Sequence, residues 1–344
     1  MFFQQIADGG CLSYLVACTE SCAAIVIDPA LAHADRYLGI LQREGLRLRY
    51  IVETHTHADH FSAARQLRER SGAPIVMHRT ARAPYVDIHV EDGHILAVGD
   101  LRPAFLHTPG HTADSACVHV ADRVFTGDTL LIGGTGRTDL PTGDPDKLYD
   151  SLFGKLLKLD PATLVYPAHD YKERSHSTIG AEIESNPRLQ KRDRVEFVAM
   201  MENLNLAAPT HLTEALRTNL TGGKTVRQLL AEAAQQTPFM GLGELERRIG
   251  RKANDFVILD VRERDAYLAG HVPGARHLPR GQLELRVDEA FPDPDIEILT
   301  VCEFGKISTL AAATLRQLGF HRAVALDGGM KMWREADKPI ESGG

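Results

Sequence analysis

Three histidines and an aspartate stand within six positions of the sequence, in the stretch HTHADH at residues 55–60. Two further histidines and a second aspartate follow downstream, in the stretches PGHT, YPAH and TGDT. The candidate metal ligands are therefore His55, His57, Asp59, His60, His111, Asp128 and His169. Imidazole and carboxylate groups suit zinc, iron, nickel or copper, and the absence of cysteine from this set argues against a closed structural zinc site. The pattern favours an open, catalytic metal centre.

Short apolar runs are expected to position these ligands. Strand-like runs at 104–107, 115–120, 123–126 and 163–166 each end near a histidine or an aspartate. Ligands at strand ends are held by a rigid sheet, while the loops that follow stay open to solvent. Gly110 and Gly127 directly precede two of the candidate ligands, where tight turns would aim those side chains inward.

A second chemistry is indicated by the stretch ILTVCEFGKIST, in which an apolar strand ends at Cys302 and a helix follows a glycine-containing loop. Backbone N–H groups at such a junction, together with the positive end of the helix, stabilise a thiolate. We therefore expect Cys302 to be the reactive thiol. The other cysteines stand in strand-like apolar runs and are interpreted as structural: Cys11, Cys18, Cys22 and Cys117.

The pattern of the chain changes twice. Helical periodicity prevails from about 175 to 236, and after Pro238 strands and helices alternate to the end of the sequence. A βαβ alternation of this kind predicts a small parallel sheet with helices on both faces. We expect two α/β domains, residues 1–237 and 238–344, the first of which carries a helical extension.

Composition narrows the classes of function. The 344 residues carry a net charge of -7, with a pI near 6.1 and no dense basic block, which argues against nucleic acid and anionic membranes as partners. The N-terminal stretch lacks the basic start of a signal peptide, so a cytoplasmic location is expected. Five scattered cysteines favour free thiols over a disulfide framework. Small-molecule substrates are therefore expected, and a homodimer is left open.

The order HxHxDH, PGHT, FTGD and YPAH resembles the metallo-β-lactamase superfamily, which implies an αββα sandwich for the first domain. This resemblance leaves open a dizinc thioesterase of the glyoxalase II type, in which two metals activate a bridging water. In that alternative His55, His57 and His111 surround one zinc ion, and Asp59, His60, Asp128 and His169 surround the other.

Longer stretches, among them FTGDTLLIGGTGRTDL and LVYPAHDYKERSHSTIGAEIESNPRL, resemble the persulfide dioxygenase branch of this superfamily over residues 2–205. The resemblance implies one Fe(II) per chain held by His55, His111 and Asp128, with positions open for substrate sulfur and O₂. It also implies that glutathione persulfide is oxidised to sulfite and glutathione. The residues expected to orient ligands or to manage protons are His57, Asp59, His60 and His169. The candidates for contacts to the carboxylates of glutathione are Arg137, Tyr171, Lys172 and Arg188.

The stretches LDVRERDAYLAGHVPGARHLP and LDGGMKMW flank Cys302 and resemble the rhodanese domain over residues 238–344. The resemblance implies that Cys302 carries a sulfur atom as a persulfide, cradled by backbone amides. The loop that would surround this persulfide is Glu303, Phe304, Gly305, Lys306, Ile307 and Ser308. Rhodanese loops that favour thiosulfate commonly carry arginine where Glu303 and Ile307 stand, so weaker anion affinity is expected.

The two resemblances together imply a bifunctional enzyme of sulfur metabolism. Its second half would move sulfane sulfur between thiosulfate, sulfite and glutathione, in a direction that the sequence leaves open. A sulfur-carrying or docking module without turnover is the alternative for residues 238–344.

Overall fold

The chain forms two compact units, Met1–Gly223 and Lys224–Gly344. The computed structural model describes residues 1–204, 206, 212–251 and 256–343. The division falls earlier than the expected boundary at 237, because helix α7 (Val226–Gln236) packs against α11 (Lys306–Gln317). Helix α7, which the sequence pattern assigned to the first domain, therefore belongs to the second unit.

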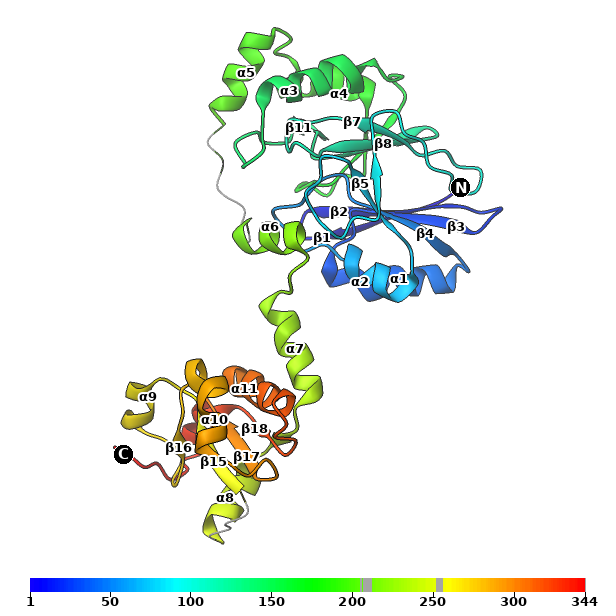
Figure 1. The fold of residues 1–344 in the computed structure, drawn as a ribbon. Coiled ribbons are helices and arrows are strands. Elements are labelled where there is room, and N and C mark those ends of the chain that lie inside the picture. The colour runs from blue at the N-terminus through cyan, green and yellow to red at the C-terminus, as the bar shows by residue number, and fades with distance from the viewer. Residues whose placement is uncertain (205, 207–211, 252–255, 344) are drawn as a thin grey trace. The chain divides into compact units, whose positions relative to one another are not determined.

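The first unit contains two main sheets that pack face to face (Figure 1). The strands of the larger sheet, in spatial order, are β1 (Phe2–Asp8), β2 (Cys11–Cys18), β3 (Ala23–Ile27), β4 (Arg47–Val52), β5 (Ile75–His78) and β6 (Ile88–Val90). Those of the second sheet are β13 (Ser177–Thr178), β12 (Leu164–Pro167), β9 (Arg123–Gly127), β8 (Ala116–Val120) and β7 (Ala104–His107). A separate short hairpin joins β10 (Leu130–Leu131) to β11 (Gly134–Thr135).

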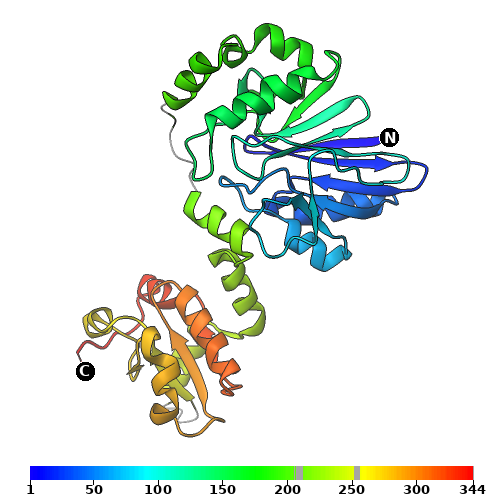
Figure 2. The ribbon, with the colours of Figure 1, turned by 45° about the horizontal axis from the view of Figure 1, so that its top comes forward.

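Helices cover the outer faces of both sheets, as the turned view also shows (Figure 2). Those on the larger sheet are α1 (Ala34–Arg43) and α2 (Ala64–Ser71). Those after the hairpin are α3 (Pro145–Tyr149), α4 (Ile179–Ser185), α5 (Arg194–Glu202) and α6 (Leu212–Thr221). The single turns of 3-10 or π helix are η1 (Leu31–His33), η2 (Asp150–Lys155), η3 (Leu156–Lys158), η4 (Pro187–Leu189) and η5 (Arg280–Gln282). The predicted αββα sandwich with a helical extension is confirmed.

Burial explains why these segments take these forms. Strand β2 has an unbroken run of buried residues, because helices cover one face of its sheet and the second sheet covers the other. Helix α1 buries Tyr37, Ile40 and Leu41, whose spacing of three and four residues places them on one helix face. Between the sheets, the rings of Tyr14 and Phe125 pack 4.9 Å apart and join the two layers.

The ends of four strands converge at one edge of this sandwich. Strands β3 and β4 are parallel neighbours in one sheet, as are β9 and β12 in the other. The carboxyl ends of parallel strands meet at the same edge of a sheet. Asp28 follows β3, His55 follows β4, Asp128 follows β9 and His169 follows β12. The fold therefore gathers side chains that are far apart in the sequence.

The second unit is a five-stranded sheet in which every pairing is parallel. Its strands, in spatial order, are β14 (Phe239–Met240), β18 (Val324–Leu326), β17 (Glu297–Val301), β15 (Phe256–Asp260) and β16 (Arg276–His277). The helices besides α7 and α11 are α8 (Leu242–Gly250), α9 (Arg264–Ala269), α10 (Leu283–Ala290) and α12 (Gly329–Glu335). Separate apolar clusters fill the two faces of the sheet, so the expected layout is confirmed. Within the described ranges, no helix is both long and apolar enough to cross a membrane.

Candidate metal centre and reactive thiol

The structure brings together the three residues that the sequence nominated first, His55, His111 and Asp128. Their ligand atoms all lie within 4.8 Å of one another. Asp128 Oδ2 is 4.0 Å from His55 Nε2 and 3.6 Å from His111 Nε2. Both imidazoles are buried, and the carboxylate is 12 % exposed.

Hydrogen bonds fix the orientation of both imidazole rings. His111 Nδ1 donates to the carbonyl oxygen of Arg137 at 2.8 Å. Thr54 Oγ1 donates to Asp28 at 2.8 Å and accepts from His55 Nδ1 at 2.9 Å. With the proton of each ring on Nδ1, the lone pair of each Nε2 points into the cluster, which is the tautomer that a metal ligand requires.

Two observations indicate that these residues suit a metal ion. His55 Nε2 is buried and has no hydrogen-bond partner among the described residues, a costly state that a bound cation relieves. Burial also holds the pKa of His55 well below its ordinary value, so the ring is neutral and able to ligate. Two imidazoles and one carboxylate form a donor set that leaves coordination positions open.

Glycine is required at the two positions that directly precede His111 and Asp128. Gly127 has φ +51°, and a Cβ atom there would lie 2.5 Å from Thr54 Oγ1, the group that orients His55. Gly110 has φ +141°, and a Cβ atom there would lie 2.3 Å from the backbone of Leu148. The tight turns expected from the sequence are present, and any side chain at either position would displace a neighbouring ligand or helix.

His169 joins the first cluster to a second one. Its Nδ1 donates to Asp128 Oδ1 at 2.6 Å, and its Nε2 donates to Asp59 Oδ2 at 2.7 Å. Burial lowers the pKa of His169, but the charge of Asp128 and the hydrogen bonds to both carboxylates raise it well above its ordinary value. In this arrangement His169 is an imidazolium that holds the unused oxygen of Asp128, so neither of its nitrogens has a free lone pair.

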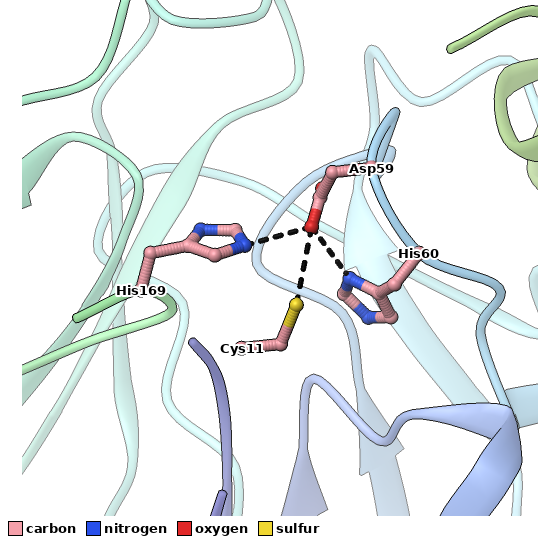
Figure 3. Close-up of side chains that lie close together, drawn as sticks. All are labelled: Cys11, Asp59, His60 and His169. Carbon is pink, nitrogen blue, oxygen red and sulfur yellow. Dashed lines mark hydrogen bonds and ion pairs between the residues drawn. The ribbon is translucent and has the colours of Figure 1, made fainter. Parts of the chain in front are cut away.

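The second cluster contains a cysteine that the sequence interpretation placed elsewhere. Asp59 Oδ2 accepts from Cys11 Sγ at 3.3 Å and lies 3.1 Å from His60 Nδ1, in addition to its bond with His169 (Figure 3). The sequence interpretation of Cys11 as structural did not place this thiol beside the centre. Strand β2 begins at Cys11, at the same edge where the metal ligands lie, and Leu12 N donates to Ala168 O beside His169. Only this pairing across the sandwich, which the sequence does not show, reveals its position.

His57 does not join the first cluster. Its Nε2 lies 3.2 Å from Asp28 Oδ1 and 3.1 Å from Glu53 Oε2, and all three side chains are buried. Burial lowers the pKa of His57, but Asp28 and Glu53 raise it well above its ordinary value. The sequence interpretation did not include these two carboxylates, although Asp28 stands directly before Pro29 at a strand end.

The HxHxDH turn is held from behind by Asn219 of α6. Its amide nitrogen donates to the carbonyl oxygens of His57 and His60, both at 2.8 Å, and its oxygen accepts from Ser62 N at 3.1 Å. The helical extension therefore contributes to the shape of the metal centre. No sequence signal singled out Asn219, because its partners are backbone groups far away in the chain.

The four candidate glutathione contacts have different surroundings. The ring of Tyr171 is 75 % exposed and stacks on His169 with a centroid separation of 5.9 Å, and Lys172 is exposed next to it. Arg137 binds Asp139 through two nitrogens, each at 2.6 Å. Arg188 donates to the carbonyl oxygen of Thr135 at 2.5 Å and supports the hairpin. Tyr171 and Lys172 thus lie at the rim of the centre, whereas the two guanidinium groups are engaged within the protein.

The thiol of the second unit lies in the expected junction. Strand β17 ends at Val301, and α11 begins at Lys306. Cys302 is 1 % exposed, and its Sγ accepts a hydrogen bond from Ser308 N at 3.1 Å and donates to Ser308 Oγ at 3.3 Å. Gly305 has φ +80° at the turn into α11, the helix that carries the Ser308 amide bound to the sulfur.

Comparisons with known proteins agree with this arrangement. Residues 6–169 match the family model described as metallo-beta-lactamase superfamily, and residues 242–336 match that of the rhodanese-like domain. The human protein named persulfide dioxygenase ETHE1, mitochondrial, is 39% identical over 214 residues, which cover 61% of this chain and 84% of that protein. The crystal structure of ETHE1 from Myxococcus xanthus is 41% identical with a TM-score of 0.63, and the match covers 65% of this chain and 100% of that one.

A third match extends over both units. The crystal structure of a metallo-beta-lactamase from Staphylococcus aureus is 22% identical with a TM-score of 0.61, and it covers 95% of this chain and 98% of that one. This likeness shows that the two proteins share a fold. The sandwich and its histidine and aspartate cluster define the class of metal-binding proteins with the metallo-β-lactamase fold. Within that class, this chain belongs to the persulfide dioxygenase family and carries a rhodanese domain after it. It is an enzyme of sulfur metabolism.

Proposed function

We propose that this chain oxidises glutathione persulfide with O₂ at one Fe(II) held by His55, His111 and Asp128. Written with GS for the glutathionyl group, the reaction is GSSH + O₂ + H₂O → GSH + SO₃²⁻ + 2 H⁺. The outer sulfur of the persulfide is oxidised and O₂ is reduced. The S–S bond breaks, and its inner sulfur leaves as the thiol.

One observation carries this proposal: two histidines with fixed tautomers and one oxygen of Asp128 converge. His57 is instead engaged by Asp28 and Glu53, and His169 by the other oxygen of Asp128 and by Asp59. When bound there, Fe(II) supplies the redox chemistry that reaction with O₂ requires, because this donor set leaves three positions free. The similarity to proteins named persulfide dioxygenase supports a persulfide as the substrate.

The remaining residues of the centre bind substrate and hold protons. His169 keeps one oxygen of Asp128 occupied, so that the other oxygen faces the two imidazoles. It also holds a proton at Nε2 against Asp59, and a proton held there can serve the departing thiol. Tyr171 and Lys172 stand at the exposed rim, where an aromatic face and an ammonium group suit a peptide with two carboxylates.

The test is metal analysis combined with oxygen consumption. We expect the purified chain to contain one iron per chain and to consume O₂ when glutathione persulfide is added, with sulfite as the product. The alternative function is a dizinc thioesterase, favoured by the second donor cluster beside the first. Two zinc ions per chain, thioester hydrolysis and no oxygen uptake would establish that alternative and overturn the proposal.

For the second unit we propose sulfur transfer through a persulfide on Cys302. The buried sulfur, the amide of Ser308 and the match to the rhodanese-like domain support this role. The two activities share reactants, because sulfite and glutathione persulfide take part in both. Mass spectrometry of the intact chain tests the transfer: we expect Cys302 to gain one sulfur atom when a sulfane donor is added. A docking module would remain unmodified, and a sulfur-carrying module without turnover would gain the sulfur atom but pass it to no thiol or sulfite acceptor.

A further inference from the structure

The Cys302 loop contains a carboxylate that is clamped by two arginines. Glu303 Oε2 lies 3.3 Å from Arg262 Nη1, and Glu303 Oε1 pairs with Arg334 Nη2 on α12. Arg262 is buried, and its guanidinium also binds Asp260, with Nη2 2.7 Å from Oδ2. The clamp therefore joins the active loop to strand β15 on one side and to α12 on the other.

This clamp is balanced in charge. Arg262 and Arg334 contribute two positive charges, and Asp260 and Glu303 contribute two negative ones. Each guanidinium beside the loop is thus already paired with a carboxylate of the protein. Within the loop itself, Lys306 is the one cationic side chain, and it is exposed. An anionic substrate that approaches Cys302 therefore encounters the negative charge of Glu303, and neither arginine of the clamp is left unpaired to attract that substrate.

The same loop presents apolar surface to solvent. Phe304 is 63% exposed and Ile307 is 50% exposed. Met332 of α12 is also exposed, and it lies against Gly328, the residue that faces Gly305 of the loop. The surroundings of the thiol therefore combine exposed apolar side chains with a charge-balanced clamp, and Lys306 is the one cation of the loop outside that clamp.

We propose that Glu303 makes Cys302 selective for organic persulfides over thiosulfate, by neutralising the two arginines beside an apolar loop. The inference rests on the sulfur transfer proposed above and names its substrate class. In its protonated form, RS–SH, an organic persulfide has no charge on the transferred sulfur, and it offers a carbon chain to Phe304 and Ile307. Thiosulfate brings two negative charges directly to the sulfur that is attacked.

The transfer step balances in atoms and electrons. The thiolate of Cys302 attacks the outer sulfur of RS–SH, and a new S–S bond forms to the cysteine. The original S–S bond of RS–SH breaks, and its electron pair leaves with RS⁻. The transferred sulfur keeps its proton. No external oxidant or reductant is needed, because the sulfane sulfur passes from one thiol to another.

The experiment measures loading of Cys302 in the full chain without O₂, so that the metal centre does not consume the donor. Thiosulfate and glutathione persulfide serve as alternative donors, and mass spectrometry follows the gain of one sulfur atom. We expect glutathione persulfide to load the native chain at least about tenfold more efficiently than thiosulfate. Glu303→Gln should raise loading by thiosulfate roughly tenfold through a lower half-saturating concentration, because it frees one positive charge.

Two further variants keep the test decisive. Arg334→Gln leaves the clamp with a net negative charge and should weaken loading by thiosulfate, which is the opposite direction to Glu303→Gln. Glu284→Gln also removes a carboxylate paired with an arginine, Arg280, but on α10 outside the loop, and it should leave the donor ratio as it is. A native chain that prefers thiosulfate, or a donor ratio that Glu303→Gln does not move, overturns the selectivity. Absence of loading by either donor overturns the sulfur transfer itself.

Discussion

The two reactive sites of this chain are built in different ways. The candidate metal centre takes its proposed ligands from turns that follow β4 and β9 and from the loop before β8, so His55 lies 56 positions before His111, and His111 lies 17 positions before Asp128. The thiol site is one loop, in which Cys302 and its donor Ser308 are six positions apart. The first site depends on side chains and on the packing of two sheets, whereas the second depends on backbone amides. The metal centre is therefore expected to be more sensitive than the thiol site to substitutions at residues far from the site.

The largest effect is expected where a ligand of the metal centre is removed. Asp128→Ala takes away the carboxylate that lies between the two imidazoles, and it leaves His169 without its Nδ1 partner. We expect iron content to fall below detection and oxygen uptake to fall at least about 100-fold. His94→Ala removes an exposed histidine and should change neither quantity. Normal iron content in Asp128→Ala would contradict the ligand assignment.

The second prediction separates the two sites functionally. In Cys302→Ser the hydroxyl cannot carry sulfane sulfur, so we expect sulfur transfer to be lost while oxygen uptake with glutathione persulfide continues at the native rate. Cys22→Ser is the matched control, because Cys22 contacts only a nearby carbonyl oxygen in the described structure, and it should keep both activities. Unchanged transfer in Cys302→Ser would show that another group carries the sulfur.

A smaller effect is expected from a change that touches no ligand. Gly127→Ala places a Cβ 2.5 Å from Thr54 Oγ1 at φ +51°, so the backbone strain should cost about 1–3 kcal/mol of folding stability. The displaced Thr54 no longer orients His55, and we expect iron affinity to fall roughly tenfold. Thermal unfolding and iron titration measure the two effects.

The control for this prediction is another glycine of the first unit. Gly154→Ala has open space around the added methyl group and an ordinary φ, so it should unfold within about 0.5 kcal/mol of the native chain. If Gly127→Ala matches this control in iron affinity, the orienting role of Thr54 is wrong.

Much of the fold follows from local patterns. The strands expected at 104–107, 123–126 and 163–166 correspond to β7, β9 and β12 within a residue or two, and the alternation after Pro238 corresponds to the parallel sheet. Apolar periodicity specifies such elements because burial acts on each segment separately. The boundary at 237 differs from the structural division because α7 packs on α11, a contact that periodicity does not encode.

The site was predictable in its residue types but not in its groupings. The histidines and aspartates were visible as a motif, and the structure divides them into one set that converges and others that pair with carboxylates. Cys11 and Asn219 were not expected at the centre, because their partners Asp59 and His57 are 48 and 162 positions away in the chain. Glu53 was also not expected, although its partner His57 is only four positions away.

The sequence by itself determined the chemistry that is available: imidazoles and carboxylates at strand ends, and one thiol between a buried strand and a helix. The tertiary structure alone decided which nitrogen of each ring is free and which carboxylate each arginine neutralises. The physical reason is that the two kinds of property depend on neighbours at different distances along the chain. Burial of a segment is a local property of its side chains, whereas proton positions and charge balance depend on neighbours that only folding brings within hydrogen-bonding distance.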